Sequence, residues 1–159
     1  MPNHTITMPA SQDEHFMRLA IEEAMLAPAH GDIPVGAVIV HDGKIIGRGH
    51  NERELHHDPS AHAEIVAMRR ASAFLGDWQL NGATLYCTLE PCCMCAGAIV
   101  QARIARVVYG AIDLKAGCAG SITDLLRHPK MTHSVDVDVG LYADECADLL
   151  NQFFKDLRA

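Results

Sequence analysis

Hydrophobic and polar residues follow two periods along this chain, and together they predict an alternation of helices and strands. The sequence Ser11-Gln-Asp-Glu14 has the form of a capping box, which predicts a helix from residue 11 to about residue 26. Two strand-like apolar runs, at residues 35–40 and 44–49, flank His41-Asp42-Gly43. Because Asp-Gly is favoured in tight hairpin turns, these two runs are predicted to pair as a β-hairpin.

The rest of the chain continues this alternation. After a polar loop at residues 51–60, the predicted elements are a helix at 61–75, a strand at 83–88, a helix at 92–102, a strand at 106–110, a short helix near 122–127, a strand at 134–139 and a helix at 143–157. The strand at 134–139 alternates strictly and places Val135, Val137 and Val139 on one face. The last helix carries an apolar stripe made of Cys146, Leu149, Leu150, Phe153, Phe154 and Leu157.

These elements predict one α/β domain, built in layers, over residues 11–159, preceded by a flexible N-terminus at residues 1–10. The length of 159 residues is enough to bury a core without disulfides, and 49% hydrophobic with 21% charged residues is ordinary for a soluble globular protein. The longest aliphatic run is far too short to span a bilayer. Six cysteines in no regular framework, with no secretory signal visible, predict a reducing, cytoplasmic location in which cysteines bind metal or fill the core.

The net charge of −7 argues against a broad nucleic-acid-binding surface, because contacts to phosphates need clustered cations. A small basic cluster of Arg127, His128 and Lys130 is compatible with a local basic rim. Taken one by one, these residues are more simply interpreted as solvated surface charges.

The strongest chemical signal combines His62-Ala63-Glu64 with Pro91-Cys92-Cys93-Met94-Cys95. His62, Cys92 and Cys95 supply three zinc ligands, and three protein ligands leave a coordination position open for water, as in catalytic zinc sites. Both motifs fall at predicted helix starts, where free N–H groups stabilise thiolates. Glu64 is placed to exchange protons with that water.

A closed, structural zinc site is the alternative interpretation of the same motifs, with a fourth ligand from Cys93 or His57. On a helix, Cys93 points about 100° away from Cys92, which disfavours it as a ligand. Cys87, Cys93 and Cys146 are most simply small core residues, and Cys118 a packing residue in a tight loop. Asn51 is either a turn residue or an amide that contacts a base, and residue type alone favours the turn.

The pattern H-x-E followed by P-C-x-x-C is the signature of zinc-dependent nucleobase deaminases, and this sequence matches it. From about residue 14 to residue 154 the chain resembles the bacterial tRNA-specific adenosine deaminases of the cytidine-deaminase-like superfamily. Three segments make the resemblance specific, namely Lys115-Ala-Gly-Cys-Ala-Gly-Ser121, Asp124-Leu-Leu-Arg-His-Pro129 and Ala143-Asp-Glu-Cys146. Cys93 departs from the family pattern, in which Pro or Val is usual at this position.

The resemblance implies a three-layer α/β/α fold with a five-stranded mixed sheet, assembled as a homodimer. It implies one Zn²⁺ per subunit, bound by His62, Cys92 and Cys95, and deamination of adenosine to inosine at the wobble position of a tRNA anticodon. By the same resemblance Glu64 is the catalytic proton shuttle. Asn51 and Asp113 are implied as substrate contacts, to the flipped base and to its flanking nucleotides respectively.

Two other functions remain open at this stage. The first is a deaminase for guanine, cytidine or another small molecule with the same zinc motif, which the Lys115–Ser121 segment and the basic cluster disfavour. The second is a non-catalytic, zinc-stabilised RNA-binding or scaffold module. Glu64 and the absence of a fourth ligand from the motif oppose it, because a scaffold needs neither a proton shuttle nor an open coordination position.

Overall fold

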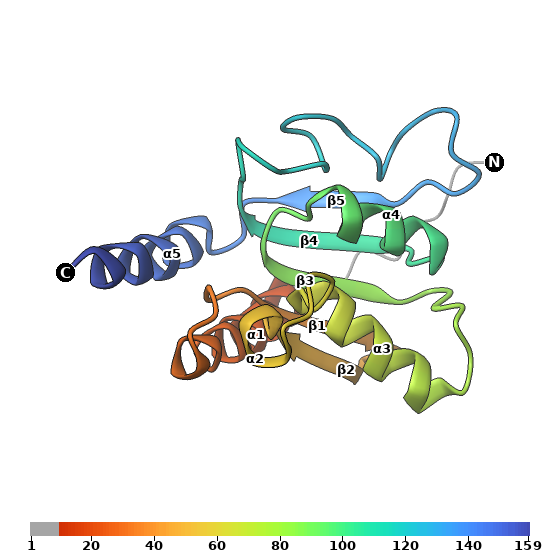
Figure 1. Ribbon diagram of the computed structural model, residues 1–159. Coiled ribbons are helices and arrows are strands. Elements are labelled where there is room, and N and C mark those ends of the chain that lie inside the picture. Colours follow the sequence, from red (N-terminus) through yellow and green to blue (C-terminus); the bar gives the residue numbers. More distant parts are fainter. Residues whose placement is uncertain (1–9) are drawn as a thin grey trace.

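A computed structural model describes residues 10–159 and shows one mixed sheet between two layers of helices (Figure 1). Its helices are α1 (Ala10–Ala24), the 3₁₀ turn η1 (Ala27–His30), α2 (Arg53–His56), α3 (Ala63–Leu75), α4 (Cys93–Gln101) and α5 (Ala143–Arg158). Its strands are β1 (Gly36–His41), β2 (Lys44–His50), β3 (Thr84–Leu89), β4 (Arg106–Ala111) and β5 (Asp136–Val139). The expected flexible terminus lies outside the described residues, except for Ala10, which begins α1.

The five strands lie in the order β2-β1-β3-β4-β5. β1 pairs antiparallel with both β2 and β3, whereas β3, β4 and β5 run parallel to one another, so the predicted five-stranded mixed sheet is confirmed. The predicted hairpin is also confirmed. Asp42 and Gly43 both have positive φ, 51° and 74°, as a tight turn between twisted strands requires.

Each face of the sheet is buried by its own pair of helices. On one face, α3 and α4 cover a core that includes Ile39, Leu85 and Val107. On the other, α1 and the start of α5 cover Val38 and Val108. Because successive side chains of a strand point to opposite faces, β1 contributes to both cores, and the predicted three-layer α/β/α arrangement is confirmed.

Gly49 allows α3 to lie unusually close to β2. A Cβ atom added at Gly49 would lie 2.7 Å from the carbonyl oxygen of Ala63 and 2.8 Å from the nitrogen of Ala67, closer than real Cβ atoms come to such atoms. The helix that carries His62 at its start is therefore positioned by direct backbone contact with the strand.

A partly buried ion-pair network ties α1 to the strands β4 and β5. The guanidinium of Arg106 donates to both carboxylate oxygens of Asp13, at 2.9 and 2.8 Å, and to Asp138 at 2.8 Å. The hydroxyl of Tyr86 donates to Asp13 at 2.7 Å. Partial burial raises the pKa of Asp13, but the hydrogen bonds from Arg106 and Tyr86 outweigh it, so the net pKa lies below the usual value.

Several local predictions need correction. No helix forms at residues 122–127, because backbone N–H groups there bond to carbonyls outside this segment. Ile122 N donates to Gly117 O at 2.8 Å and Leu125 N donates to Cys118 O at 2.9 Å. The polar loop at 51–60 contains the short helix α2, and α1 begins at Ala10, one residue before the predicted capping box.

The apolar stripe of α5 is only partly buried. Cys146 is buried, whereas Phe154 is 39% and Leu157 70% exposed, because the C-terminal half of α5 extends beyond the sheet (Figure 1). Val139 is likewise 48% exposed, since β5 is the edge strand. Within residues 10–159, none of the helices has the length and apolar character needed to cross a membrane.

Candidate metal centre and active-site pocket

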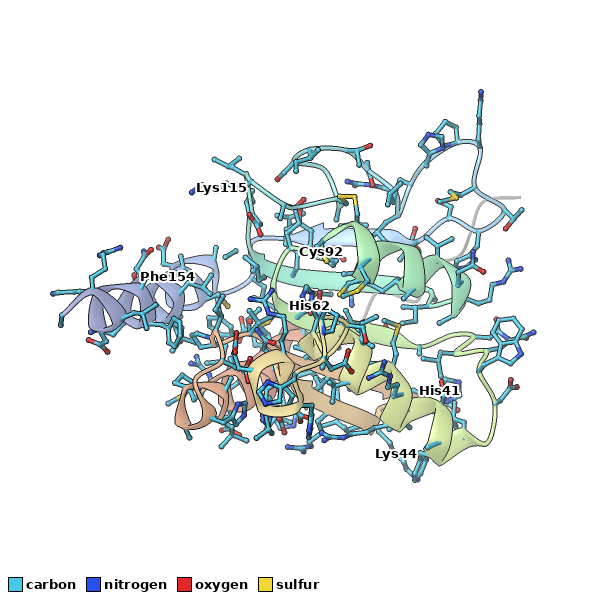
Figure 2. All side chains as sticks on the ribbon, in the orientation of Figure 1. His41, Lys44, His62, Cys92, Lys115 and Phe154 are labelled. Carbon is cyan, nitrogen blue, oxygen red and sulfur yellow. A yellow bond between two sulfur atoms is a disulfide. The ribbon has the colours of Figure 1, made fainter. Side chains whose placement is uncertain are left out.

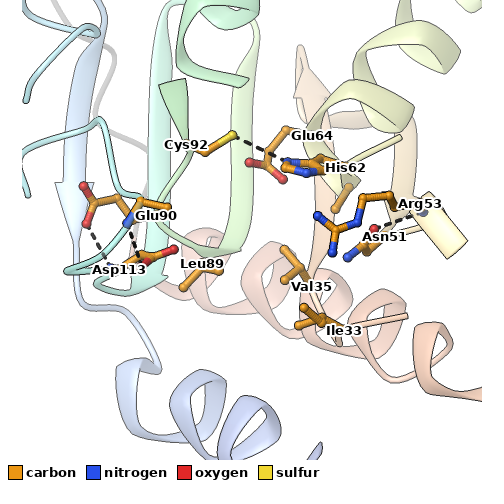
Figure 3. Close-up of a pocket in the computed structure, with 12 residues that line it drawn as sticks. Ile33, Val35, Asn51, Arg53, His62, Glu64, Leu89, Glu90, Cys92 and Asp113 are labelled. Carbon is orange, nitrogen blue, oxygen red and sulfur yellow. Dashed lines mark hydrogen bonds between the residues drawn. The ribbon is translucent and has the colours of Figure 1, made fainter. Parts of the chain in front are cut away.

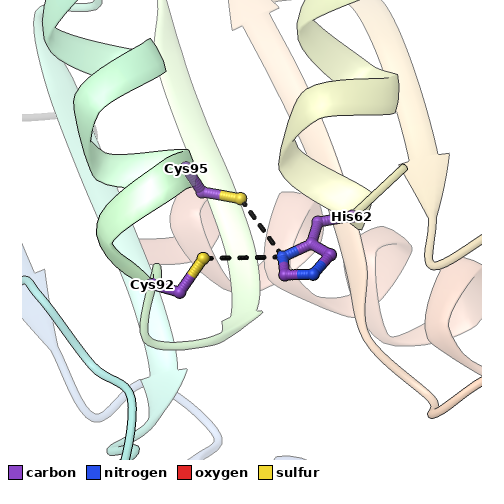
Figure 4. A group of neighbouring side chains, drawn as sticks. All are labelled: His62, Cys92 and Cys95. Atoms are coloured by element: carbon purple, nitrogen blue, oxygen red, sulfur yellow. Dashed lines mark hydrogen bonds between the residues drawn. The ribbon is translucent and has the colours of Figure 1, made fainter. Parts of the chain in front are cut away.

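His62, Cys92 and Cys95 come together between the starts of α3 and α4 (Figure 4). His62 is the N-cap residue of α3 and Cys92 the N-cap residue of α4, so each precedes the first helical turn in which the sequence placed it. Their carbonyl oxygens accept the first helical hydrogen bonds, from Val66 N at 2.9 Å and Ala96 N at 2.8 Å. Two matched helix ends therefore orient the ligands.

The separations between these side chains fit a tetrahedral zinc ion. His62 Nδ1 lies 3.5 Å from Cys92 Sγ and 3.5 Å from Cys95 Sγ. Ligand atoms about 2.0 Å (nitrogen) and about 2.3 Å (sulfur) from a tetrahedral zinc ion lie about 3.5 Å apart. The three ligand atoms all lie within 4.8 Å of one another, and no other His, Cys, Asp or Glu in the described part of the chain joins this group. The three side chains that the sequence predicts as zinc ligands are therefore positioned to hold the ion.

The protonation of the cysteine pair also suits a cation. A hydrogen bond from the Cys95 thiol, aided by His62, lowers the pKa of Cys92 to about 4. The hydrogen bond to Cys92 raises the pKa of Cys95 well above its ordinary value, and burial adds to this. The lowered pKa of Cys92 favours a thiolate at this position, and a divalent cation would deprotonate both thiols because coordinated thiols are deprotonated.

Cys93 and His57 do not complete a four-ligand site. Cys93 forms a disulfide with Cys118, 25 residues further along the chain (Figure 2). The predictions that Cys93 is a core residue and that Cys118 only packs in its loop are therefore wrong, and Cys93 is also exposed. Because the antiparallel bridge between Cys92 and Gly117 brings the two segments together, spacing along the sequence could not reveal this pairing.

Glu64 lies in the first turn of α3 with only 4% of its surface exposed. Burial raises its pKa above the ordinary carboxyl value, and a hydrogen bond to its own backbone offsets part of that effect. A buried carboxyl group with a raised pKa can take up and release a proton near neutral pH.

A pocket of about 140 Å³ opens beside these groups (Figure 3). Glu64, His62 and Cys92 form its inner end. Apolar side chains from the segment before β1 and from the end of β3 form its walls, namely Ile33, Val35 and Leu89. A concave pocket that combines apolar walls with a few polar and ionisable groups is the usual form of a site for a small organic ligand.

Asn51 and Arg53 line another side of the pocket. Asn51 is 7% exposed, and its Oδ1 accepts a hydrogen bond from Arg53 N at 3.1 Å, so it is a turn residue and a pocket residue at once. The sequence did not single out Arg53. The indication in the sequence was that Arg53 lies two residues after Asn51, in the same polar loop.

Asp113 lies on the opposite side of the pocket, at the start of the segment of residues 113–121, which we call the 113–121 loop. Its carboxylate accepts hydrogen bonds from Lys115 N and Ala116 N, both at 3.1 Å, and Ala116 lines the pocket as well. One cavity is therefore lined by five of the six site residues predicted from the sequence, namely Asn51, His62, Glu64, Cys92 and Asp113. The sixth, Cys95, lies beside it in the metal-ligand group.

The basic cluster predicted near residues 127–130 does not border this pocket. Arg127 pairs with Asp124 at 2.7 Å. The neighbouring His133 contacts the carbonyl of Ile104 at 2.7 Å, which places this segment near the N-terminal end of β4, whereas the pocket lies at the C-terminal end of β3. Arg53 is the arginine that lines the pocket.

Comparison with known proteins identifies the family. Residues 10–111, more than half of the chain, match the family described as the cytidine and deoxycytidylate deaminase zinc-binding region. This match spans His62, Glu64, Cys92 and Cys95. The geometry of the His/Cys/Cys group agrees with the zinc-binding function that the family description names.

Individual relatives are more specific. The tRNA-specific adenosine deaminase of Bacillus subtilis is 47% identical over 148 residues, covering 93% of this chain and 92% of the relative. The one of Haemophilus influenzae is 48% identical over 147 residues, covering 92% and 85% respectively. A solved structure from studies of A-to-I editing by tRNA deaminases at the wobble position superimposes with a TM-score of 0.83 at 46% identity, covering 86% of this chain and 99% of that one. This chain therefore belongs to the zinc-binding cytidine and deoxycytidylate deaminase family, within the group of tRNA-specific adenosine deaminases.

Proposed function

We propose that this protein catalyses the hydrolytic deamination of adenosine to inosine at the wobble position of a tRNA anticodon. The observation that carries the proposal is the pocket in which a three-ligand His/Cys/Cys group adjoins a buried carboxyl group. Relatives named tRNA-specific adenosine deaminases, at 47% and 48% identity over nearly the whole chain, support tRNA as the substrate.

His62, Cys92 and Cys95 would hold one zinc ion, which supplies a nucleophilic water at neutral pH when bound. Glu64 would act as the proton shuttle. It takes a proton from the attacking water and delivers it to N1 of adenine. It then takes the second proton from the hydroxyl group now bonded to C6 and delivers it to the departing amine, so that the C6–N bond breaks and adenosine and water yield inosine and ammonia. Its raised pKa and its burial favour a group that alternates between the two protonation states.

The target base would have to leave its stack to enter the pocket. Ile33, Val35 and Leu89 offer apolar surface to its faces, and Asn51 would hydrogen-bond the base. Asp113, on the opposite side of the pocket, would contact the nucleotides that flank the target. An anticodon loop suits this geometry because its unpaired bases can be splayed out at low cost.

We further propose that the protein is a cytoplasmic homodimer and that residues 11–159 form one domain. An apolar hollow between α3 and α4, lined by Ile65, Met68 and the 60% exposed Trp78, supports pairing with a second copy. β5 and α5 pack on the same sheet as the family-matched segment, which supports a single domain. Equilibrium sedimentation tests the dimer, since one chain has a mass of 17.3 kDa.

The decisive experiment incubates the zinc-loaded protein with a synthetic anticodon stem-loop that carries adenosine at the wobble position. Liquid chromatography of the digested nucleosides then measures inosine. A stem-loop with guanosine at that position is the matched substrate control, and free adenosine is expected to be essentially inert. Glu64→Gln is the matched protein control, because it keeps the shape of the side chain while removing the proton shuttle.

Two results would refute the proposal. Turnover of free guanine, cytidine or adenosine at a rate comparable to that of the stem-loop would indicate a small-molecule deaminase with the same zinc motif. If the natural protein and Glu64→Gln bind the stem-loop with equal affinity and neither produces inosine, the protein is a non-catalytic RNA-binding module.

A further inference from the structure

Glu90 is a buried carboxylate that the proposed chemistry leaves without a role. It lies between the end of β3 and the zinc-ligand turn, only two residues before Cys92, and it is 2% exposed although it borders the pocket. A buried charge is costly unless hydrogen bonds compensate it, so its partners indicate what it does.

Within residues 10–159, all the hydrogen-bond partners of this carboxylate belong to the 113–121 loop. Oε1 accepts hydrogen bonds from Asp113 N at 3.1 Å and from the Ser121 hydroxyl at 2.5 Å. Oε2 accepts hydrogen bonds from Ala119 N and Ser121 N, both at 3.1 Å. Figure 3 shows the first of these bonds, between Glu90 and the backbone of Asp113. The loop therefore closes around a single anion with three backbone N–H groups and one hydroxyl, as in an anion-binding nest.

These four bonds leave Glu90 no free acceptor position for a substrate. An ionised carboxylate has about four lone-pair sites, and each oxygen here already accepts two hydrogen bonds. Glu90 is therefore not suited to bind a base or to move a proton, in contrast to Glu64 on the other side of the pocket.

The backbone around Glu90 is adapted to this contact. A Cβ atom added at Gly117 would overlap the Glu90 carboxylate and would lie 2.5 Å from Asp113 O. Cys118 N donates to Pro91 O at 2.8 Å, and Gly117 forms a bridge with Cys92. The loop is thus attached to the same turn that presents Cys92, and it encloses the carboxylate of Glu90.

We propose that Glu90 is a positioning residue that anchors the 113–121 loop and thereby sets the wall of the pocket formed by Asp113 and Ala116. Without this anion, three backbone N–H groups converge on a buried space and the loop cannot keep its course. The part of this inference that concerns substrate affinity rests on the proposed RNA substrate. The anchoring itself does not, because it concerns only contacts within the protein.

Glu90→Gln tests the anchoring with minimal change in size. The introduced NH₂ group faces hydrogen-bond donors of the loop, so at least one backbone N–H loses its acceptor. We expect hydrogen–deuterium exchange at the amides of Asp113, Ala119 and Ser121 to accelerate about tenfold or more in the zinc-loaded protein without RNA, while zinc content stays at one per chain. Ser121→Ala removes only the hydroxyl bond and should accelerate the same amides less.

Val108→Ala provides a control for general destabilisation, because Val108 is buried on the opposite face of the sheet. When its loss in Tm equals that of Glu90→Gln, Val108→Ala should leave hydrogen–deuterium exchange in the 113–121 loop unchanged. With the stem-loop substrate, Glu90→Gln should raise KM about tenfold and leave kcat within about twofold, because it affects binding and not the chemical step.

Unchanged exchange in the loop of Glu90→Gln, or acceleration equal to that in Val108→Ala, would overturn the anchoring. A fall in kcat at constant KM would instead place Glu90 in the chemistry and would overturn its role in positioning. If the natural protein produces no inosine in the stem-loop, the proposed function fails, whereas the exchange rates still decide whether Glu90 anchors the loop.

Discussion

Replacing Gly49 with alanine should weaken zinc binding although Gly49 is not a ligand. The added methyl group would lie 2.7 Å from the carbonyl oxygen of Ala63, the residue that follows His62. Ordinary van der Waals contact begins at about 3.4 Å, so the first turn of α3 must move away from β2 by about 0.7 Å. His62 is the N-cap residue that directly precedes this turn, and it should move with it.

The size of this displacement sets the expected effect. A functional zinc site tolerates deviations of about 0.2 Å in its ligand distances, so a shift of about 0.7 Å in the imidazole relative to Cys92 and Cys95 should lower zinc affinity roughly 10–100-fold. Overpacking of this kind also destabilises the fold, by about 1–3 kcal/mol. For a protein of this length that corresponds to a fall in Tm of roughly 2–12 °C.

The measurement is zinc affinity by competition with a chromophoric chelator, well below the Tm, together with thermal unfolding. Gly97→Ala is the matched control. Gly97 lies within α4, and a Cβ atom added there would meet nothing within 4 Å, so alanine should leave zinc affinity unchanged and raise stability by about 0.5–1 kcal/mol through helix propensity. If Gly49→Ala binds zinc as tightly as the natural protein does, this result refutes the argument that contact between β2 and α3 positions His62.

Three other variants test the site and the fold. Cys92→Ala should lose nearly all bound zinc, measured by elemental analysis, and should also unfold at a lower temperature, because metal binding is coupled to folding. The double change Cys93→Ser and Cys118→Ser should retain one zinc per chain, and loss of zinc would show that one of these sulfurs is a ligand. Asp13→Asn should cost about 2 kcal/mol of unfolding free energy in urea at pH 7, because it disrupts the pairing with Arg106. Since the pKa of Asp13 is lowered in the fold, its stabilisation is present above the unfolded-state pKa of about 3.9 and is lost as the pH falls through the folded-state pKa. The difference from the natural protein should therefore shrink below about pH 4, and a difference independent of pH would contradict the assignment.

Local features of this protein could be predicted from the sequence because they depend on neighbouring residues. The hairpin turn at Asp42 and Gly43 follows from the backbone conformations that these residue types permit, and the structure confirms it. The metal-ligand group could be predicted because a Cys-x-x-Cys spacing brings the N-cap residue Cys92 and the first-turn residue Cys95 to the same end of α4. His62 has the corresponding N-cap position of α3.

Contacts between distant segments were decided by the tertiary structure alone. The disulfide between Cys93 and Cys118 arises where the loop after β4 crosses the start of α4, and no spacing rule relates two such positions. Residues 122–127 have the composition of a helix, but their N–H groups find partners elsewhere in the fold, which removes the helix. The three residues that supply the four hydrogen-bond donors to Glu90 lie 23–31 positions beyond it. Its role therefore becomes apparent only when the sheet brings the ends of β3 and β4 side by side, because hydrogen-bond partners are determined by position in space and not by distance along the chain.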